Sequence, residues 1–140
     1  MENIKLKITT AQTIDKAGNE DVIELVTEAI REVQDDDSII IKYDESDITE
    51  NRLSKTKIRI YKDKMIMTKV GDISSRMEFE ENKSYKNVYS TPYGNFNLEF
   101  KTFQYNNALD ESGKGSLYIE YKIVFGGSDE SLNKIVIDIF

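Results

Sequence analysis

No cysteine and no histidine occur among the 140 residues of the chain. The absence of cysteine excludes disulfides, thiolate nucleophiles and thiolate metal sites. The absence of histidine removes the side chain best suited to proton exchange near neutral pH, and with it the usual imidazole ligand of zinc, copper and haem iron. Catalytic triads that contain histidine are therefore excluded, and any catalysis would rest on carboxylates, Lys, Tyr, Ser or Thr. We expect no metal site and no cofactor.

Basic residues are also scarce, since 19 Lys and Arg face 26 Asp and Glu, for a net charge of −7. Nucleic acids and anionic membranes both bind basic surfaces, so neither partner is expected. No run approaches the about 20 apolar residues of a membrane-spanning helix. The opening residues, MENIKLKITT, lack the apolar core and cleavage site of a signal peptide. These features predict a cytoplasmic protein.

Apolar and polar residues alternate along much of the chain, which is the pattern of strands with one buried face. The clearest run has its apolar members at Leu117, Ile119, Tyr121, Ile123 and Phe125. Turn-forming residues separate the runs at intervals of about 8–12 residues. The pattern predicts one all-β domain over residues 1–140 with about 8–10 antiparallel strands. Because a sheet that wide curls and closure removes its edges, we expect a closed or nearly closed up-and-down barrel.

The segment from Asn19 to Val33 leaves two interpretations open. Its apolar residues follow helical spacing, with Asn19 as the cap: Val22, Leu25, Val26, Ala29, Ile30 and Val33. The alternative is a strand that carries Ile23, Leu25 and Thr27 on one face and pairs with the first strand. The local pattern favours neither.

Several segments together resemble the YwiB-like family of small bacterial proteins, whose function is unknown. They are Glu24–Glu28, Ile41–Ser46, Lys57–Ile60, Ser75–Glu80 and Tyr89–Gly94, followed by a closing amphipathic hairpin. The resemblance covers nearly the whole chain and is most specific where Met-x-Phe precedes Tyr-x-Thr-Pro-Tyr-Gly. It implies a calycin-like (lipocalin-like) β-barrel in which residues 22–33 form a strand. Ala29 stands in place of a family glycine, which implies either a less sharply bent strand or a helix. The resemblance implies no catalytic or binding residues.

The best candidate for a polar ligand site combines Arg59, Arg76, Tyr89 and Tyr93. Arginine can bind a carboxylate or phosphate with two hydrogen bonds, and tyrosine can donate from the rim of a site. The alternative is structural: both arginines would be solvent-facing cross-strand partners of glutamates, and Tyr93 would pack against its own turn.

Other residue groups are ambiguous in the same way. Met65, Met67 and Met77 would line an adaptable apolar cavity or simply fill the core. Two pairs of carboxylates would suit acid/base chemistry, but nothing distinguishes them among the 26 acidic residues. These pairs are Glu78 with Glu80 and Glu45 with Asp47.

The favoured function is therefore a calycin-type barrel that binds a small apolar or weakly anionic ligand in a cavity of at least several hundred Å³, roughly the scale of known ligand pockets. The alternative is an interaction module that binds another protein or forms a homo-oligomer through outward-facing apolar residues. The candidates for that surface are Ile40, Phe103, Val124, Val136 and Phe140. An enzyme is a distant third interpretation.

Overall fold

A computed structural model describes residues 2–13, 19–47, 52–71, 74–125 and 129–140, without the side chains of residues 45–47, 52–54, 89–91, 125 and 129. Every regular element in these ranges is a strand. The strands are β1 (Glu2–Thr13), β2 (Glu20–Val33), β3 (Ile39–Asp47), β4 (Arg52–Ile60), β5 (Lys64–Val70), β6 (Ser75–Glu80), β7 (Ser84–Thr91), β8 (Gly94–Leu109), β9 (Gly115–Phe125) and β10 (Asp129–Ile139). Nowhere in these ranges is there a helix that could cross a membrane.

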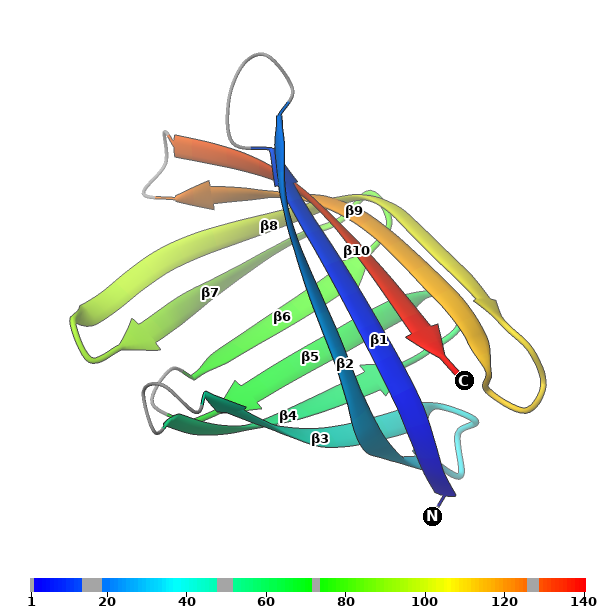
Figure 1. Ribbon diagram of the computed structural model, residues 1–140. Coiled ribbons are helices and arrows are strands. Elements are labelled where there is room, and N and C mark those ends of the chain that lie inside the picture. The colour runs from blue at the N-terminus through cyan, green and yellow to red at the C-terminus, as the bar shows by residue number, and fades with distance from the viewer. Residues whose placement is uncertain (1, 14–18, 48–51, 72–73, 126–128) are drawn as a thin grey trace.

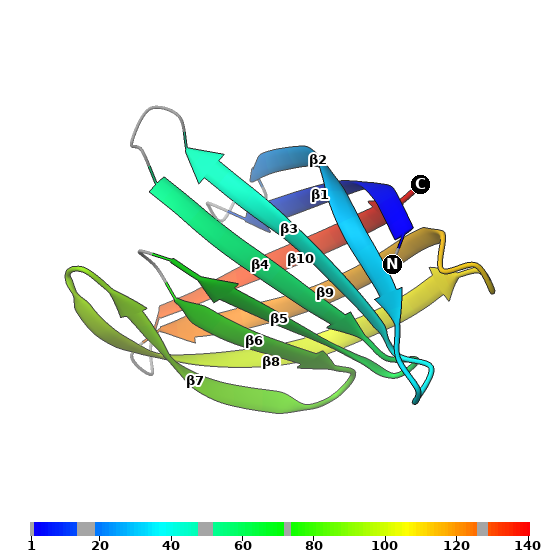
Figure 2. The same ribbon diagram turned by 90° about the horizontal axis from the view of Figure 1, so that it is seen from below.

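The ten strands form one antiparallel sheet in the order β6-β5-β4-β3-β2-β1-β10-β9-β8-β7. Strands that follow each other in the chain pair with each other, except β6 and β7, and β1 also pairs with β10, so the sheet curls into a nearly closed barrel (Figures 1 and 2). The predicted all-β up-and-down barrel is confirmed. Residues 20–33 form a strand, so the strand interpretation of this segment is confirmed and the helical one is wrong.

The barrel is completed between its two edge strands, β6 and β7, without a backbone ladder among the described residues. The turn between them binds β8 instead: the N–H of Asn82 donates to the carbonyl of Thr102 at 2.9 Å, and the N–H of Thr102 donates to that of Lys83 at 3.1 Å. Farther along, the side-chain amide of Asn87 donates to the carbonyl of Arg76. Polar contacts at separate points therefore replace a continuous ladder at this seam.

Aromatic packing holds the same seam from inside. The ring of Phe79 on β6 lies edge-on to Phe100 on β8, with 6.2 Å between centroids, and lies 4.6 Å from the ring of Tyr121 on β9. Phe79 and Phe100 are buried among the inward-facing side chains of the core. The fully buried members of the core are almost all aliphatic: Leu6, Ile41, Ile58, Met65, Leu117, Ile119 and Ile137. The alternation of apolar residues therefore places a packed core inside the barrel.

The two ends of the barrel differ. At one end, which we call the closed end, lie the short turns at residues 34–38, 61–63, 81–83 and 110–114, together with the start of β1 and the end of β10 (Figure 1). A bulge in β8 between Thr102 and Gln104 reverses the strand's alternation, so that Tyr105 and Asn107 turn inward there. The Tyr105 hydroxyl lies 2.7 Å from the carbonyl oxygen of Tyr61, and burial raises the pKa of Tyr105.

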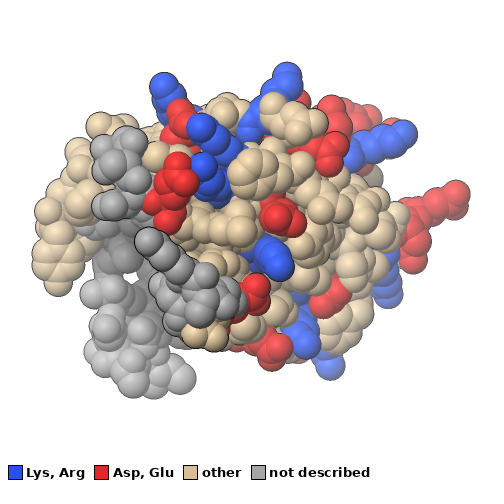
Figure 3. All heavy atoms as spheres, turned by 90° about the horizontal axis from the view of Figure 1, so that it is seen from above, with Lys and Arg blue, Asp and Glu red and all other residues tan. Residues whose placement is uncertain are grey.

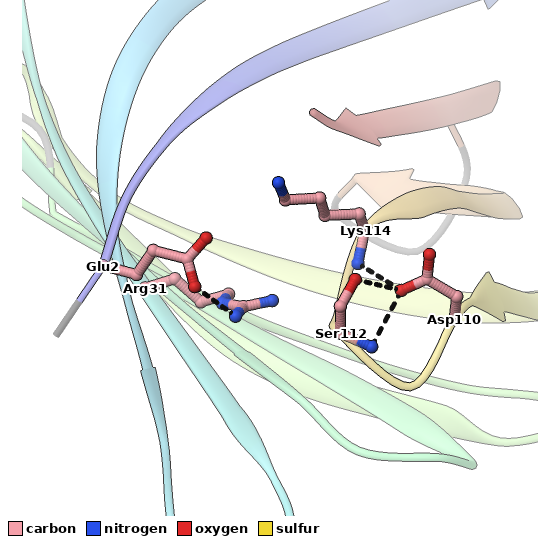
Figure 4. A network of polar contacts seen from close by, with 5 residues as sticks. All are labelled: Glu2, Arg31, Asp110, Ser112 and Lys114. Atoms are coloured by element: carbon pink, nitrogen blue, oxygen red, sulfur yellow. Dashed lines mark hydrogen bonds and ion pairs between the residues drawn. The ribbon is translucent and has the colours of Figure 1, made fainter.

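Arg31 also seals the closed end. Its buried guanidinium forms an ion pair with Glu2 and lies beneath the β8–β9 turn (Figure 4). The turn fits closely over it, because a Cβ added to Gly113 would lie 2.3 Å from Nη1 of Arg31. Asp110 shapes the turn by accepting hydrogen bonds from the Ser112 hydroxyl and the Lys114 N–H, and these bonds lower the pKa of Asp110.

Candidate functional site

The barrel wall opens between β2 and β3. β2 pairs with β1 along Glu20–Arg31, but it pairs with β3 only along Ile30–Val33. The two strands meet at their shared turn and diverge away from it (Figure 2). Within the described ranges, the β3-facing edge of residues 20–29 therefore has no ladder partner. Like charges coincide with the start of the divergence: Ile30 pairs with Lys42, so the next outward pair in that register would be Glu28 with Asp44. Like charges directly opposite each other destabilise a pair of strands.

A cleft of about 820 Å³ occupies this divergence. Three inward-facing residues form its floor: Ile4, Ala29 and Tyr43, all of them buried. Its rim consists of outward-facing residues: Asn3, Lys5, Glu28, Ile30, Lys42, Asp44 and Phe140. The cleft therefore combines an apolar floor with a rim that carries charges of both signs. The surface in Figure 3 likewise shows Lys and Arg interspersed with Asp and Glu over the face drawn.

The free edge of β2 presents backbone donors and acceptors toward β3, from the cleft outward. Lys5 of β1 and Phe140 exchange both backbone hydrogen bonds, at 2.9 and 3.0 Å. Backbone N–H and C=O groups point alternately to the two sides of a strand. Because those of Lys5 point to Phe140, those of the even-numbered residues of β1 point to β2. The residues opposite them on β2 are odd-numbered, as in the pair of Leu6 with Thr27. The N–H and C=O groups of the even-numbered residues of β2 therefore point toward β3. Between Glu20 and Ala29 these are Val22, Glu24, Val26 and Glu28.

The same strand carries an unusual number of exposed apolar side chains. Among the described residues, five of the twelve large exposed apolar residues lie on β2: Val22, Ile23, Val26, Ile30 and Val33. Val26 is 63% exposed. Edge strands of stable monomers are normally short, twisted or charged, because a long apolar edge pairs with other chains. β2 keeps its acidic residues but is long and apolar on both faces.

This strand also explains the helical spacing in the sequence. Val22 and Val26 face outward while Ile23 and Leu25 face inward, so both faces of the strand are apolar. Apolar residues on both faces imitate the spacing of a helix. The apolar residues on both faces of this segment are therefore the sequence signal for the site, and from sequence alone the same residues fit a helix as well as a strand.

The two arginines of the predicted ligand site lie on the outer face of the barrel and are separated by β5. Arg59 on β4 contacts the β2–β3 turn: its Nη2 lies 3.1 Å from Asp36 Oδ2, and its Nε donates to the Ser38 hydroxyl at 3.2 Å. The Ser38 hydroxyl donates in turn to Asp36, and this bond is the main cause of the lowered pKa of Asp36. Arg76 on β6 lies 3.9 Å from Glu78.

The two tyrosines of that predicted site lie together near the β7–β8 turn, apart from Arg59. Tyr93 is in the turn itself and is 91% exposed. Tyr89 pairs with Phe96 on the backbone, and its side chain lies outside the described residues. Tyr89 and Tyr93 are therefore near each other because they lie at the same turn, whereas Arg59 and Arg76 lie on different strands with β5 between them. Their joint role in ligand binding stays a prediction.

The other sequence candidates have clear positions as well. Met65 and Met67 are buried in the core, as the core-filling interpretation requires. The expectation that Ile40 is exposed is wrong, because it is only 8% exposed on the outer face. Phe103 and Phe140 are exposed as expected, whereas Val124 and Val136 are half-buried. The side chains of Glu45 and Asp47 lie outside the described part of the chain.

A second group of polar residues lies inside the barrel. Thr102, Tyr121, Asn133 and Gln12 form one inward-facing row across β8, β9, β10 and β1. Gln12 donates to the hydroxyl of Ser131 at 2.8 Å, and Asn133 donates to the same oxygen at 3.1 Å. The hydroxyl of Thr102 is buried without a hydrogen-bond partner in the described structure, and burial raises the pKa of Tyr121.

Fold and site together define the class of this protein: a nearly closed, lipocalin-like barrel of ten antiparallel strands whose wall opens between β2 and β3. The chain belongs to the family described as "Domain of unknown function (DUF1934)", whose profile matches residues 7–137. The crystal structure of ywiB protein from Bacillus subtilis superposes with a TM-score of 0.72 at 18% sequence identity, covering 97% of this chain and 90% of that one. A comparison with curated proteins finds no match. The resemblance to the YwiB-like family is thereby confirmed.

Proposed function

We propose that this protein is an interaction module that binds an extended segment of a partner polypeptide in the β2–β3 cleft, as a strand added to β2. The single observation that carries the proposal is the free edge of β2, which has the cleft at its Glu28–Ile30 end and carries exposed apolar side chains. Addition of a strand to an exposed sheet edge is a recurring mode of peptide recognition.

The energetics favour this mode. An added strand would form backbone hydrogen bonds with Val22, Glu24, Val26 and Glu28, each worth about 0.5–1.5 kcal/mol net of the bonds to water that it replaces. It would also cover the exposed apolar side chains of β2, and full burial of a valine or isoleucine contributes about 1.5–3 kcal/mol. Only part of this surface is covered in a shallow cleft, and association has its own entropic cost. The sum is consistent with a specific but reversible partner.

The small apolar or weakly anionic ligand predicted from the sequence remains the second candidate. The observation that favours it is that two hydroxyls, Thr102 in the inward-facing polar row and Thr56 on β4, are buried without hydrogen-bond partners among the described residues. A ligand in the barrel would supply those partners, but so would ordered water. Native mass spectrometry of gently purified protein tests this candidate, because a retained ligand adds a mass that disappears on denaturation. A native mass equal to that of the bare chain contradicts it.

The proposal is tested by one substitution on the free edge. Val26→Pro removes an N–H on the free edge of β2, next to the cleft, and leaves the ladder with β1 unbroken, and proline is tolerated at such edge positions. Val26→Thr keeps both the N–H and the β-branched shape and is the matched control. Peptides selected from a displayed random library on the wild-type protein should bind Val26→Thr about as well as wild type. They should bind Val26→Pro about tenfold more weakly or worse, the size expected for loss of one or two interface hydrogen bonds.

Amide hydrogen exchange locates the bound peptide. In the free protein the amides of Val22, Glu24, Val26 and Glu28 should exchange quickly, while the odd-numbered amides bonded to β1 are protected. Bound peptide should slow exchange at the even-numbered positions. Failure to select any peptide, or binding that Val26→Pro leaves unchanged, refutes the proposed function.

A further inference from the structure

We infer that the segment bound in the β2–β3 cleft alternates apolar residues, directed into the barrel, with basic residues directed to solvent. This inference rests on the proposed function and adds the chemistry of the partner. It follows from the different character of the two faces that an added strand would acquire between β2 and β3.

The inward face of the cleft is apolar. Leu25 on β2 packs against the core, Ala29 and Tyr43 are buried at the cleft floor, and Ile23 continues the inward face toward the open end. Side chains of an added strand alternate between the two faces of the sheet. Every second residue of the segment would therefore contact these apolar groups, where a charged side chain would lose its hydration without a partner.

The outward-facing charged residues of β2 between residues 20 and 29 are all acidic: Glu20, Glu24 and Glu28. Glu20 forms an exposed ion pair with Lys134 of β10, with 3.6 Å between Nζ and Oε1. Glu24 has a partner in Lys7, but the closest atoms are 3.9 Å apart and more than half of the glutamate side chain is exposed, so this ion pair is weak. Within the described structure Glu28 has no ion pair, although Lys5 lies opposite it on β1.

The sharpest requirement comes from Glu28 and Asp44. Both carboxylates line the cleft, and they would be the next outward pair if the β2–β3 register continued past Ile30 and Lys42. A strand inserted between them would place an outward side chain next to both. A lysine or arginine there would pair with the two carboxylates, whereas an acidic residue would add a third negative charge. Complementary charge of this kind controls partner choice and the rate of encounter more than it controls raw affinity.

A second copy of this chain is a poor occupant by the same reasoning. If two β2 edges paired, each would bring four carboxylates from residues 20–29 and no basic side chain. The net charge of −7 on each copy opposes the approach as well. The favoured occupant is therefore a basic and apolar segment of a different protein.

Three synthetic peptides of about seven residues, a usual strand length, test the inference. All have isoleucine or valine at alternate positions, and the intervening residues are lysine, threonine or glutamate. Affinity is measured by fluorescence anisotropy at low and high salt. The lysine peptide should bind about tenfold more tightly than the threonine peptide, and this preference should shrink as salt rises. The glutamate peptide should bind least.

A double variant tests whether the carboxylates of the cleft cause the preference for lysine peptides. Glu28→Gln with Asp44→Asn should abolish most of the preference for lysine over threonine. Glu81→Gln with Glu111→Gln removes the same charge from exposed turns at the closed end and should leave the preference unchanged. An unchanged preference in the cleft variant would overturn the inference.

The remaining outcomes separate this inference from the function on which it rests. If the threonine peptide binds as well as the lysine peptide, and Val26→Pro weakens both, the basic partner is refuted and strand addition stands. If none of the three peptides binds and library selection also fails, both are refuted. A dimer in solution that Val26→Pro dissociates would show that a second copy occupies the cleft, which overturns the inference.

Discussion

Replacement of Phe79 by alanine tests how the barrel is closed. Phe79 comes from the edge strand β6, is 0% exposed, and contacts Phe100 and Tyr121 from the other side of the seam. No ladder joins β6 to β7 among the described residues, and these ring contacts pack β6 against β8 and β9 across the seam. The substitution therefore removes both a core side chain and the link between the two edges of the sheet.

The expected loss follows from the packing. Deletion of a buried phenylalanine side chain costs about 3–5 kcal/mol, including the cavity left behind. Favourable ring geometry contributes about 0.5–1.5 kcal/mol beyond the buried area, which places Phe79→Ala in the upper half of that range. With a slope of about 2 kcal/mol per molar urea, the midpoint of unfolding should fall by roughly 2 M. Urea titration followed by far-ultraviolet circular dichroism measures this shift.

Phe96→Ala on β8 is the matched control, because Phe96 is 51% exposed and should lose about 1 kcal/mol or less. Phe79→Leu, which leaves a smaller cavity, should lose about 1–2 kcal/mol and keeps the test usable if the alanine variant does not fold. A loss in Phe79→Ala no larger than that in Phe96→Ala would refute closure of the barrel by the aromatic cluster.

Three further predictions concern the closed end and the buried tyrosines. Tyr105→Phe removes the hydroxyl that reaches the carbonyl of Tyr61 and should destabilise the protein by about 1–2 kcal/mol in urea, and an unchanged midpoint would contradict this. Gly113→Ala forces a side chain into φ 78° against Arg31 and should lose about 1–3 kcal/mol in thermal melts, unless the turn relaxes freely. Burial raises the pKa of Tyr105 and Tyr121 above the ordinary tyrosine value near 10. The free energy of unfolding should therefore be constant with respect to these groups below about pH 10 and fall as pH rises further. Tyrosinate absorbance should show the two side chains ionising only when the protein unfolds.

Much of the architecture was accessible from sequence because its signals are local. Apolar alternation such as Leu117 to Phe125 needs only the two-residue repeat of a strand and one buried face. The turn signals at Asp35–Asp37, Lys62–Lys64, Glu81–Lys83 and Asp110–Gly115 coincide with the turns of the closed end. Local signals of this kind predict the strands and their up-and-down order. The number of strands then predicts a barrel, because a sheet that wide curls and closure removes its edges.

Features that depend on contacts between distant residues were missed or left open. The bulge after Thr102 turns Tyr105 inward, where its hydroxyl bonds to Tyr61 beside the β4–β5 turn, 44 residues earlier. Ile40 was expected outside and exposed, yet it is buried on the outer face, where β3 pairs with β4 and Arg59 stands opposite it. The two arginines of the predicted ligand site are separated by a strand.

The sequence by itself determined that this chain forms a sheet of many short antiparallel strands around an apolar core, since each strand's pattern expresses its own burial. Only the tertiary structure decided where the sheet stops pairing. β2 pairs with β1 along Glu20–Arg31 but with β3 only from Ile30 onward, and Glu28 and Asp44 would be the next outward pair before that point. Whether an edge is paired depends on the partner strand as well as on the strand itself, and that information is absent from any local segment. The candidate site lies at this edge.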